Sequence, residues 1–426
     1  MDGQRSTLRL AKAMFLLVMA LCFQGCHEQF SGSLFKGKYP HQRYQERLDQ
    51  TGLEQSAMYR YWVDAAQRGL DHPVSVTVPY QENAYMSAAF PSAAGYLFSA
   101  QEGERLQVLV STQSMDSVAV FVDLFAFSDD TTKQHRHLIS SEQGDSILSW
   151  EVRNDGQYLL RIQPELMAEV SYDLRLPADP SLANPVDPEA SQHIGSFFGV
   201  PRDGGARQHE GIDIFAEKLT PVVAASSGLI TRVGTNRLGG KVVWLRPNDR
   251  DHRVNLYYAH LDSQMVESGQ VVSVGDTLGL MGNTGNAITT PPHLHFGVYG
   301  SDGAVDPMPF LRPGKSNPSS ITGNMERLGA SVRIAANMLA IVEALSNEGY
   351  RVRLMDGESR LVTTREVSQM STLRSTRLEQ ETVLYAQPDT NAARITSLPF
   401  GESARVLAEY GSFLLIDAPQ RGWIAK

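Results

Sequence analysis

Hydrophobic and polar residues alternate along much of the chain, which is the pattern of β-strands with one buried face. The alternation is strict from Val170 to Leu176, and three further stretches between residues 72 and 176 have a similar character. These stretches are Leu106–Val110, Val118–Phe127 and Gln157–Ile162. Turns that contain Gly, Asn and Asp separate them, so the pattern predicts an antiparallel β-sandwich over residues 72–176.

The pattern changes on both sides of this segment. Residues 26–71 are polar except around Ser56–Leu70, where Met58, Trp62 and Ala65 are spaced for one face of a helix. We therefore expect a tether that contains a short helix. Residues 177–191 hold four prolines and predict a linker. The Gly- and Val-rich residues 192–312 show no long amphipathic helix and predict a second β-rich domain.

Two shorter β-rich segments follow a second predicted linker at residues 313–325. Residues 326–370 predict a strand, a turn and a strand around Tyr350 and Leu361. Residues 377–426 end in Gly422-Trp423-Ile424, which resembles the last turn and strand of bacterial SH3-type barrels. The earlier segment is then either a degenerate second SH3-like copy or part of a single C-terminal β-domain.

The first 25 residues predict export. Arg5, Arg9 and Lys12 precede the apolar run Ala13–Phe23, which is too short to span a membrane comfortably as a permanent helix. Cys26 ends a Phe-Gln-Gly-Cys sequence that resembles the processing box of bacterial lipoproteins, although the usual box begins with an aliphatic and a small residue. Residues 1–25 are therefore predicted to be a lipoprotein-type signal peptide, with Cys26 as the lipidated first residue. Secretion without lipidation is the alternative.

The composition of the chain excludes some classes of binding partner and some kinds of metal site. The 426 residues carry 38 Lys and Arg against 47 Asp and Glu, a formal charge of −9, so no broad basic surface for nucleic acid is expected. Both cysteines, Cys22 and Cys26, lie near the N-terminus. This position excludes a disulfide-built scaffold and any four-cysteine metal site. We expect the mature protein to work outside the cytoplasm without disulfides.

Histidine and aspartate recur in three motifs of the central domain. The motifs are His209-Glu-Gly-Ile-Asp213, Tyr257-Tyr-Ala-His260-Leu-Asp262 and Pro292-His293-Leu-His295-Phe296. A hydrolytic metal site needs about three protein ligands and an open position for water, and imidazole with carboxylate favours Zn²⁺. Residues two apart in a strand share a face, so His293 and His295 can face one cleft, and spacing alone does not say which binds metal. Gly211 disfavours a helix, which places His209 and Asp213 on a loop that runs into a strand.

Other candidates have simpler interpretations. His135 and His137 form a second His-x-His, but they lie in a polar run without the matching Asp motif, so we expect an exposed turn. Arg202 and Arg207 are equally suited to bind substrate carboxylates and to hold loops through ion pairs.

The central motifs resemble those of the lysostaphin/LytM-type zinc metallopeptidases of bacterial cell walls, which carry His-x-x-x-Asp and a later His-x-His. The resemblance covers about 120 residues in family order: Phe198-Gly199, Arg202, Arg207–Phe215, Thr220–Ala224, Gly228, Tyr258–Leu261, Gly269-Gln270, Gly275-Asp276, Gly282–Gly285 and Pro292–Phe296. It implies that His209, Asp213 and His295 bind one Zn²⁺ per chain and that His260 and His293 are catalytic. The chain is thus predicted to be mainly β, with an N-terminal β-sandwich, a central LytM-type peptidase domain and one or two C-terminal SH3-like barrels. The sandwich resembles pre-peptidase accessory domains in layout only.

The resemblance implies a zinc-dependent endopeptidase that hydrolyses the peptide cross-links of peptidoglycan, since Zn²⁺ can bring the pKa of bound water to ~7. A lipoprotein without a wall-sorting motif suits a Gram-negative envelope, so we predict the DD type of cross-link. The expected location is the outer membrane, facing the periplasm, with the lipid on Cys26 as anchor. The alternatives are a non-catalytic activator of other wall hydrolases and a secreted protease of general proteins. All five site residues are present, which disfavours the first alternative, and the SH3-type segments disfavour the second.

Overall fold

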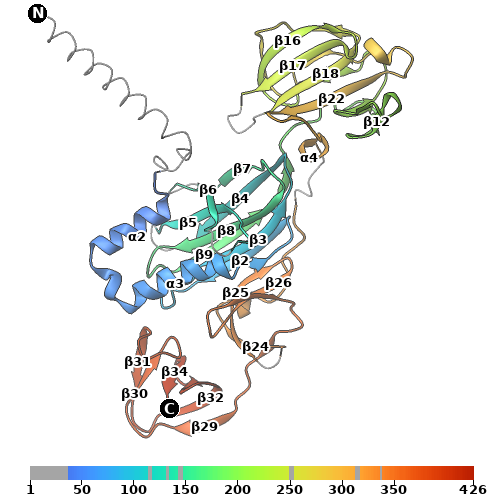
Figure 1. Ribbon diagram of the computed structural model, residues 1–426. Helices are drawn as coiled ribbons and strands as arrows, with labels where there is room; N and C mark the ends of the chain where they lie inside the picture. The colour runs from blue at the N-terminus through green and yellow to red at the C-terminus, as the bar shows by residue number, and fades with distance from the viewer. Residues whose placement is uncertain are drawn as a thin grey trace, which may run out of the picture.

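A computed structural model describes residues 37–113, 118–130, 134–142, 147–248, 254–311, 317–335 and 338–426. The predicted signal peptide and Cys26 lie outside these residues. The described chain is mainly β, as the alternating pattern predicts, and it forms a string of bodies joined end to end (Figure 1). Within these ranges, no helix combines the length and the apolar character needed to cross a membrane.

The N-terminal body consists of two helices and two sheets. Its elements are α2 (Pro40–Gln50), η1 (Leu53–Gln55), α3 (Ala57–Asp71), β1 (Val74–Ser75), β2 (Tyr80–Met86), β3 (Ala94–Ala100), β4 (Glu104–Gln113), β5 (Val120–Ala126), β6 (Arg136–Ser140), β7 (Ile147–Glu151), β8 (Gly156–Pro164), β9 (Val170–Leu176) and β10 (Ala178–Pro180). One sheet has the order β1-β3-β8-β5-β6, and the other begins β10-β4-β9-β2. Apolar side chains of both sheets, among them Tyr96, Leu160 and Leu174, share one core.

The two helices pack against this body. The Ser56 hydroxyl caps α3, which confirms the helix predicted around Ser56–Leu70. Trp62 on α3 is buried, and its Nε1 donates to the Pro164 carbonyl oxygen at 2.9 Å. His41 on α2 stacks on Trp62 with ring centroids 4.7 Å apart. The prediction of a tether is therefore wrong for residues 40–71, because a few aromatic anchors fix an otherwise polar segment.

Residues 178–186, which we call the strap, join the N-terminal body to the central one. The strap begins as β10 at the edge of β4. It then runs into the central body, where the amides of Leu182 and Ala183 donate to the carbonyl oxygens of Phe310 and Ala225 at 3.0 and 2.9 Å. Leu182 and Val186 are buried in the central core. The proline-rich segment predicted as a linker is therefore a fixed connection, because its few apolar side chains anchor it.

The central body carries the predicted metal motifs. Its elements are β11 (His193–Ser196), β12 (Pro201–Arg202), η2 (Asp203–Gly205), β13 (Arg207–Gln208), β14 (Ile212–Phe215), β15 (Pro221–Val223), β16 (Gly228–Asn236), β17 (Gly240–Pro247), β18 (Asn255–Leu261), β19 (Ser263–Gln264), β20 (Val271–Val272), β21 (Thr277–Leu280), η3 (Gly285–Ala287), β22 (His293–Gly300), β23 (Gly303–Val305) and α4 (Met308–Leu311). The main sheet has the order β11-β14-β22-β18-β17-β16-β20, with β23 paired to β22. Its one α-helix in the described residues is a single turn, as the sequence predicts.

The segment after the central body returns to the N-terminal body. Its elements are η4 (Met325–Arg327), β24 (Ser331–Ile334), β25 (Met338–Ser346), β26 (Gly349–Leu354), β27 (Ser359–Val362) and β28 (Ser368–Gln369). The predicted strand, turn and strand are β26 and β27, which pair antiparallel. β25 pairs with β2, with Glu82 opposite Ser346. Neither alternative for residues 326–370, a degenerate SH3-like copy or part of a single C-terminal β-domain, anticipates this pairing, because these strands extend a sheet that began near the N-terminus.

A buried cluster of charges lies at this junction. Arg351 is fully buried and donates to Glu82 Oε1 at 3.1 Å and to Glu343 Oε2 at 2.7 Å. The hydroxyls of Tyr80 and Tyr96 also donate to Glu82. We call Glu82, Glu343 and Arg351 the charge cluster.

The C-terminal body is a six-stranded sheet. Its strands are β29 (Arg374–Arg377), β30 (Thr382–Tyr385), β31 (Arg394–Leu398), β32 (Ser403–Tyr410), β33 (Phe413–Asp417) and β34 (Arg421–Ala425). They have the order β29-β32-β33-β34-β30-β31, and Trp423 of the last strand is buried. The SH3-like assignment of residues 377–426 stays a prediction.

Candidate metal centre

Strand pairing brings the two predicted motifs together. β14 and β22 are antiparallel neighbours, and their register puts Asp213 opposite His295 and Phe215 opposite His293. Directly opposed residues project from the same face of a sheet, so these four side chains share one face. The ring of Phe215 stacks on that of His293, with centroids 4.8 Å apart. Both histidines of the His-x-His motif therefore face the same space, as the sequence predicts.

His209 reaches this face from the loop between β13 and β14, as expected. Its backbone is held by hydrogen bonds of 2.8 and 2.9 Å with Gly199 and Val200. Gly211 lets the loop pass close to β22, because a Cβ there would lie 2.4 Å from the Phe296 carbonyl oxygen and 2.8 Å from His295 Cε1. A side chain at position 211 would displace His295, one of the candidate ligands, which explains why glycine is needed there.

Three donor atoms converge at one point. His209 Nε2 lies 3.0 Å from Asp213 Oδ1 and 2.9 Å from His295 Nδ1, and His295 Nδ1 lies 3.1 Å from the same carboxylate oxygen. Tetrahedral Zn²⁺ with bonds of about 2.0–2.1 Å would hold such atoms about 3.3 Å apart. Among the described residues, this is the one group of three or more His, Cys, Asp or Glu side chains whose donor atoms gather in this way.

The protonation of these donors fits a cation. His209 Nδ1 lies 2.8 Å from the Phe197 carbonyl oxygen, which can only accept, so in neutral His209 the proton is on Nδ1. Its Nε2 then presents an electron pair to the carboxylate and to His295. Burial alone would raise the pKa of Asp213, but its close contacts with the rings of His209 and His295, which are favourable when these rings carry a proton towards it, hold the pKa well below its usual value. Two imidazole nitrogens and an anionic oxygen repel one another unless a positive charge lies between them, so the donor set suits a divalent metal.

Arg202 holds the other side of the carboxylate. Its Nη2 donates to Asp213 Oδ2 at 2.7 Å and to the Ser196 hydroxyl at 2.8 Å. Of the two roles left open by the sequence, the structure shows the ion pair. This contact fixes Asp213 so that its Oδ1 faces the histidines.

His260 reaches the same centre by breaking the alternation of β18. Ala259 pairs with His295, so regular alternation would send the next side chain to the opposite face. His260 instead has a left-handed backbone with φ of 65°, and its ring centroid lies 5.0 Å from that of His293 and 5.9 Å from that of His295. Left-handed backbone is uncommon outside glycine and concentrates at functional sites.

His260 and His293 share one tautomeric arrangement. Nδ1 of His260 lies 2.9 Å from the Thr284 carbonyl oxygen, and Nδ1 of His293 lies 2.9 Å from that of Pro291. In the neutral rings Nδ1 is thus the donor and Nε2 carries the basic electron pair. Burial, with the neighbouring His293, lowers the pKa of His260 to about 4, so His260 is neutral at pH 7. The sequence could not show these carbonyl partners, because a backbone acceptor leaves no mark in residue identity.

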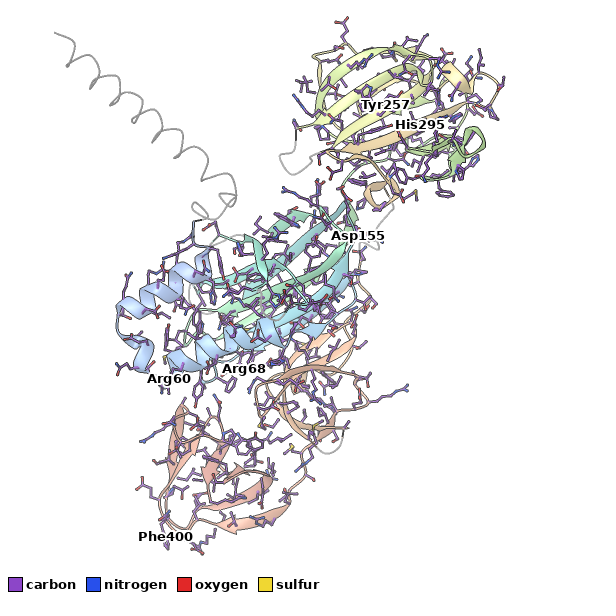
Figure 2. The ribbon with its side chains drawn as sticks, viewed as in Figure 1. Arg60, Arg68, Asp155, Tyr257, His295 and Phe400 are labelled. Carbon is purple, nitrogen blue, oxygen red and sulfur yellow. The ribbon has the colours of Figure 1, made fainter. Side chains whose placement is uncertain are left out.

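An aromatic cluster adjoins the centre. Tyr257 lies beside His295 with ring centroids 6.0 Å apart (Figure 2). Trp244 and Tyr299 contact Tyr257 at 4.5 and 6.1 Å between centroids. We did not predict this cluster, although Tyr257 and Tyr299 lie at the same alternating positions as Ala259 and His295 on their strands.

The second His-x-His is unrelated to the centre. His137 lies in β6, where its ring stacks on Tyr39 at 4.2 Å, and His135 stacks on Phe127 at 4.9 Å. The prediction of an exposed turn is wrong here, because aromatic contacts hold this polar run against the N-terminal body.

Known proteins resemble the central body. The family model for peptidase family M23 matches residues 207–307. The L-Ala–D-Glu endopeptidase of Bacillus subtilis is 37% identical over 120 residues, which cover 26% of this chain and 36% of that protein. Lysostaphin of Staphylococcus simulans is 41% identical over 109 residues, covering 24% of this chain and 21% of its own length. The peptidoglycan DD-endopeptidase ShyC of Vibrio cholerae is 30% identical over 137 residues, covering 30% of each chain.

The match is confined to one part of each protein. This chain spans between 21% and 36% of the length of these three relatives. The matched residues contain all five side chains that meet at the candidate metal centre. Residues 207–307 are therefore a domain of peptidase family M23 with lysostaphin-type homologues.

Proposed function

We propose that this chain is a zinc-dependent endopeptidase that hydrolyses peptide cross-links of peptidoglycan. The observation that carries the proposal is the convergence of three electron-pair donors on one point, beside two histidines whose basic Nε2 atoms are free of the backbone. The names of two relatives, an L-Ala–D-Glu endopeptidase and a peptidoglycan DD-endopeptidase, support peptidoglycan as the substrate class.

His209, Asp213 and His295 would hold one Zn²⁺. When bound, the metal would supply a water of lowered pKa, ~7, and a Lewis acid for the peptide carbonyl. The task of Arg202 is to keep the Asp213 carboxylate oriented, through its 2.7 Å contact with Oδ2. The Phe197 carbonyl oxygen orients the His209 ring in the same way and fixes its tautomer.

His260 and His293 would move protons. Each ring is anchored through Nδ1, so Nε2 can take a proton from the attacking water and give it to the leaving amine nitrogen. His260 is neutral at pH 7, because its pKa is lowered to about 4, so the electron pair of its Nε2 is available to accept a proton. Tyr257 and its aromatic neighbours lie next to His295, where they would contact the substrate strand.

The type of peptide bond that is hydrolysed and the location of the protein are inferred from the sequence. The two endopeptidase relatives are named for different bonds, and we propose the DD cross-link because the predicted lipid anchor on Cys26 suits a Gram-negative periplasm. We propose that the C-terminal body holds the enzyme near the wall and that the lipid holds it at the outer membrane.

The deciding experiment uses purified cross-linked muropeptide dimers with no other enzyme present. Wild type with zinc should release monomers, and mass spectrometry of the products identifies the bond. His260→Ala and His293→Ala should keep their zinc and lose about 10²–10⁴-fold in rate, mainly in turnover. A non-catalytic activator would leave the dimers uncut, and its His260→Ala variant would still stimulate a partner hydrolase.

A further inference from the structure

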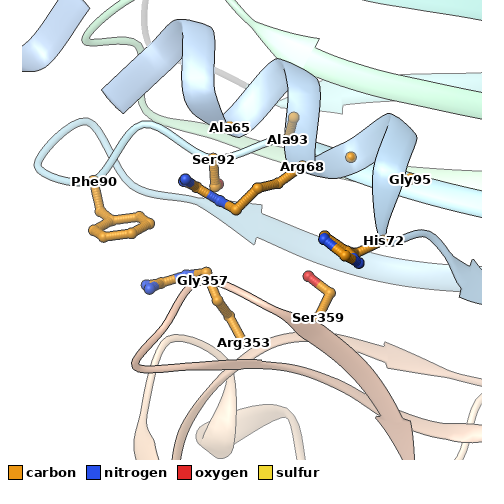
Figure 3. Close-up of a pocket in the computed structure, with 11 residues that line it drawn as sticks. Ala65, Arg68, His72, Phe90, Ser92, Ala93, Gly95, Arg353, Gly357 and Ser359 are labelled. Atoms are coloured by element: carbon orange, nitrogen blue, oxygen red, sulfur yellow. The ribbon is translucent and has the colours of Figure 1, made fainter. Parts of the chain in front are cut away.

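A small pocket lies where three segments of the accessory bodies meet. Side chains of α3, of the loop that leads into β3 and of the β26–β27 hairpin line it, as Figure 3 shows. None of its lining residues belongs to the central body. Its polar side chains are Arg68, His72, Ser92, Arg353 and Ser359, and no carboxylate is among its lining residues.

Glycine residues bring these segments into direct contact. A Cβ on Gly95 would lie 1.7 Å from the Gly69 carbonyl oxygen, so α3 and β3 touch backbone to backbone. A Cβ on Gly357, whose φ is +90°, would lie 2.9 Å from Arg68 Nε. The Arg68 side chain therefore lies directly over the hairpin turn, and the pocket is enclosed by fixed backbone on its sides.

Two arginines, Arg68 and Arg353, line the pocket, and among the described residues Glu343 is the one carboxylate that pairs with either of them. Glu343 is shared, because Oε1 accepts from Arg353 Nε at 2.8 Å and Oε2 accepts from Arg351 at 2.7 Å. Glu82 also binds Arg351. No hydrogen bond or ion pair within the described ranges reaches the guanidinium of Arg68. Burial lowers the pKa of Arg353, Glu343 raises it, and the charge of Arg68 lowers it further.

Two hydroxyl groups also lack partners there. Ser92 is 6% exposed, and no hydrogen bond reaches its hydroxyl from the described residues. In Figure 3 the Ser92 side chain lies beside the Arg68 side chain. Ser359 faces His72 in the same view, and its hydroxyl is equally without a partner in the described chain. The unpartnered groups of the pocket thus include two hydroxyls and a full positive charge.

We propose that this pocket binds the carboxylate group of a ligand. Arg68 and Arg353 would donate to its two oxygens, and Ser92 would donate to one of them. The cavity volume of about 10 Å³ admits only about one water-sized group, so one carboxylate oxygen would lie inside it and the rest of the ligand at its mouth. A flat carboxylate would crowd that mouth less than a tetrahedral phosphate. The bound group would connect α3 to the β26–β27 hairpin and would stabilise their contact.

The test follows thermal unfolding of the full chain at constant ionic strength. Sodium acetate is the probe, acetamide is the neutral analogue and inorganic phosphate is the larger anion. Acetate should raise the wild-type midpoint and acetamide should not, because a ligand of the folded state stabilises it by mass action. Arg68→Gln should weaken acetate binding by about tenfold or more, as expected for one lost hydrogen bond to an anion. Arg60→Gln, on the same helix and outside the pocket, should respond as wild type does (Figure 2).

A second comparison separates an anion site from a structural arginine. Without acetate, Arg68→Gln should keep the wild-type midpoint or raise it, since Arg68 faces another cation and has no partner to lose. A lower midpoint without acetate would overturn the proposal, as would equal acetate responses in Arg68→Gln and wild type. A larger shift with phosphate than with acetate would show that the ligand class is wrong.

Discussion

Replacing Arg351 with Met tests whether the charge cluster joins the N-terminal body to the segment β24–β28. Arg351 is the one side chain that binds both carboxylates of the cluster, and its side chain is fully buried. Met keeps much of the length of the side chain and removes the charge. Glu82 would then be a buried carboxylate whose only remaining donors in the described residues are the hydroxyls of Tyr80, Tyr96 and Tyr172.

The expected effect is large. Removing one partner of a buried ion pair costs about 3–5 kcal/mol, because the other charge stays buried. With about 1.4 kcal/mol for each factor of ten, local opening should become about 100- to 4,000-fold more frequent. The amides of β2 and β25 should show it, since these strands pair beside the cluster. Hydrogen exchange measured by mass spectrometry on peptides from both strands reports this opening directly.

Two further variants sharpen the result. Arg360→Met removes the exposed ion pair with Glu358 on the neighbouring strand β27 and should leave exchange in β2 and β25 nearly unchanged. Adding Glu82→Gln to Arg351→Met removes the uncompensated charge and should restore part of the protection. If Arg351→Met exchanges no faster than Arg360→Met, the cluster does not join the two segments and the reasoning is refuted.

Three other outcomes are expected. His209→Ala, Asp213→Ala and His295→Ala should each lose the roughly one zinc per chain expected of wild type, and elemental analysis that finds full zinc in any of them contradicts the ligand assignment. Burial lowers the pKa of His41 to about 4, whereas its pKa in the unfolded chain is about 6.5. The stability that depends on neutral His41 is therefore fully present above pH 6.5. About 3 kcal/mol of this stability should be lost as pH falls from 6.5 to 4, and denaturation midpoints of His41→Gln should depend less on pH over that range. Cys26→Ser should no longer incorporate labelled fatty acid and should leave the membrane fraction, whereas a wild type that never labels is simply secreted.

Local patterns predicted the β-rich character and several strands correctly. Val170–Leu176 is β9 as the alternation requires, and Gln157–Ile162 falls in β8. Partners of strands were not predictable, because a period of two identifies a half-buried strand and carries no information on its neighbour. For this reason the sequence of residues 326–370 did not indicate that strand β25 pairs with β2 across more than 250 residues of chain.

The sequence predicted the residues of the metal centre more completely than it predicted the fold around them. Spacing placed His293 and His295 on one face, and the register of β14 and β22 adds Asp213 to that face. Sequence reasoning could not choose a role for Arg202, because an ion pair depends on a side chain that another strand delivers. The same holds for the left-handed turn of His260, since no local residue type demands it.

The pairing of β2 with β25 also has a kinetic consequence. β2 ends at Met86 and β25 begins at Met338, so about 250 residues must follow β2 before its partner exists. At about 5–20 residues per second, a ribosome needs roughly 12–50 s for that length. During this time β2 would present an unpaired edge, with Glu82 awaiting its cation. The interval exposes the nascent chain to wrong pairing, and a chaperone that covers strand edges would be most useful then.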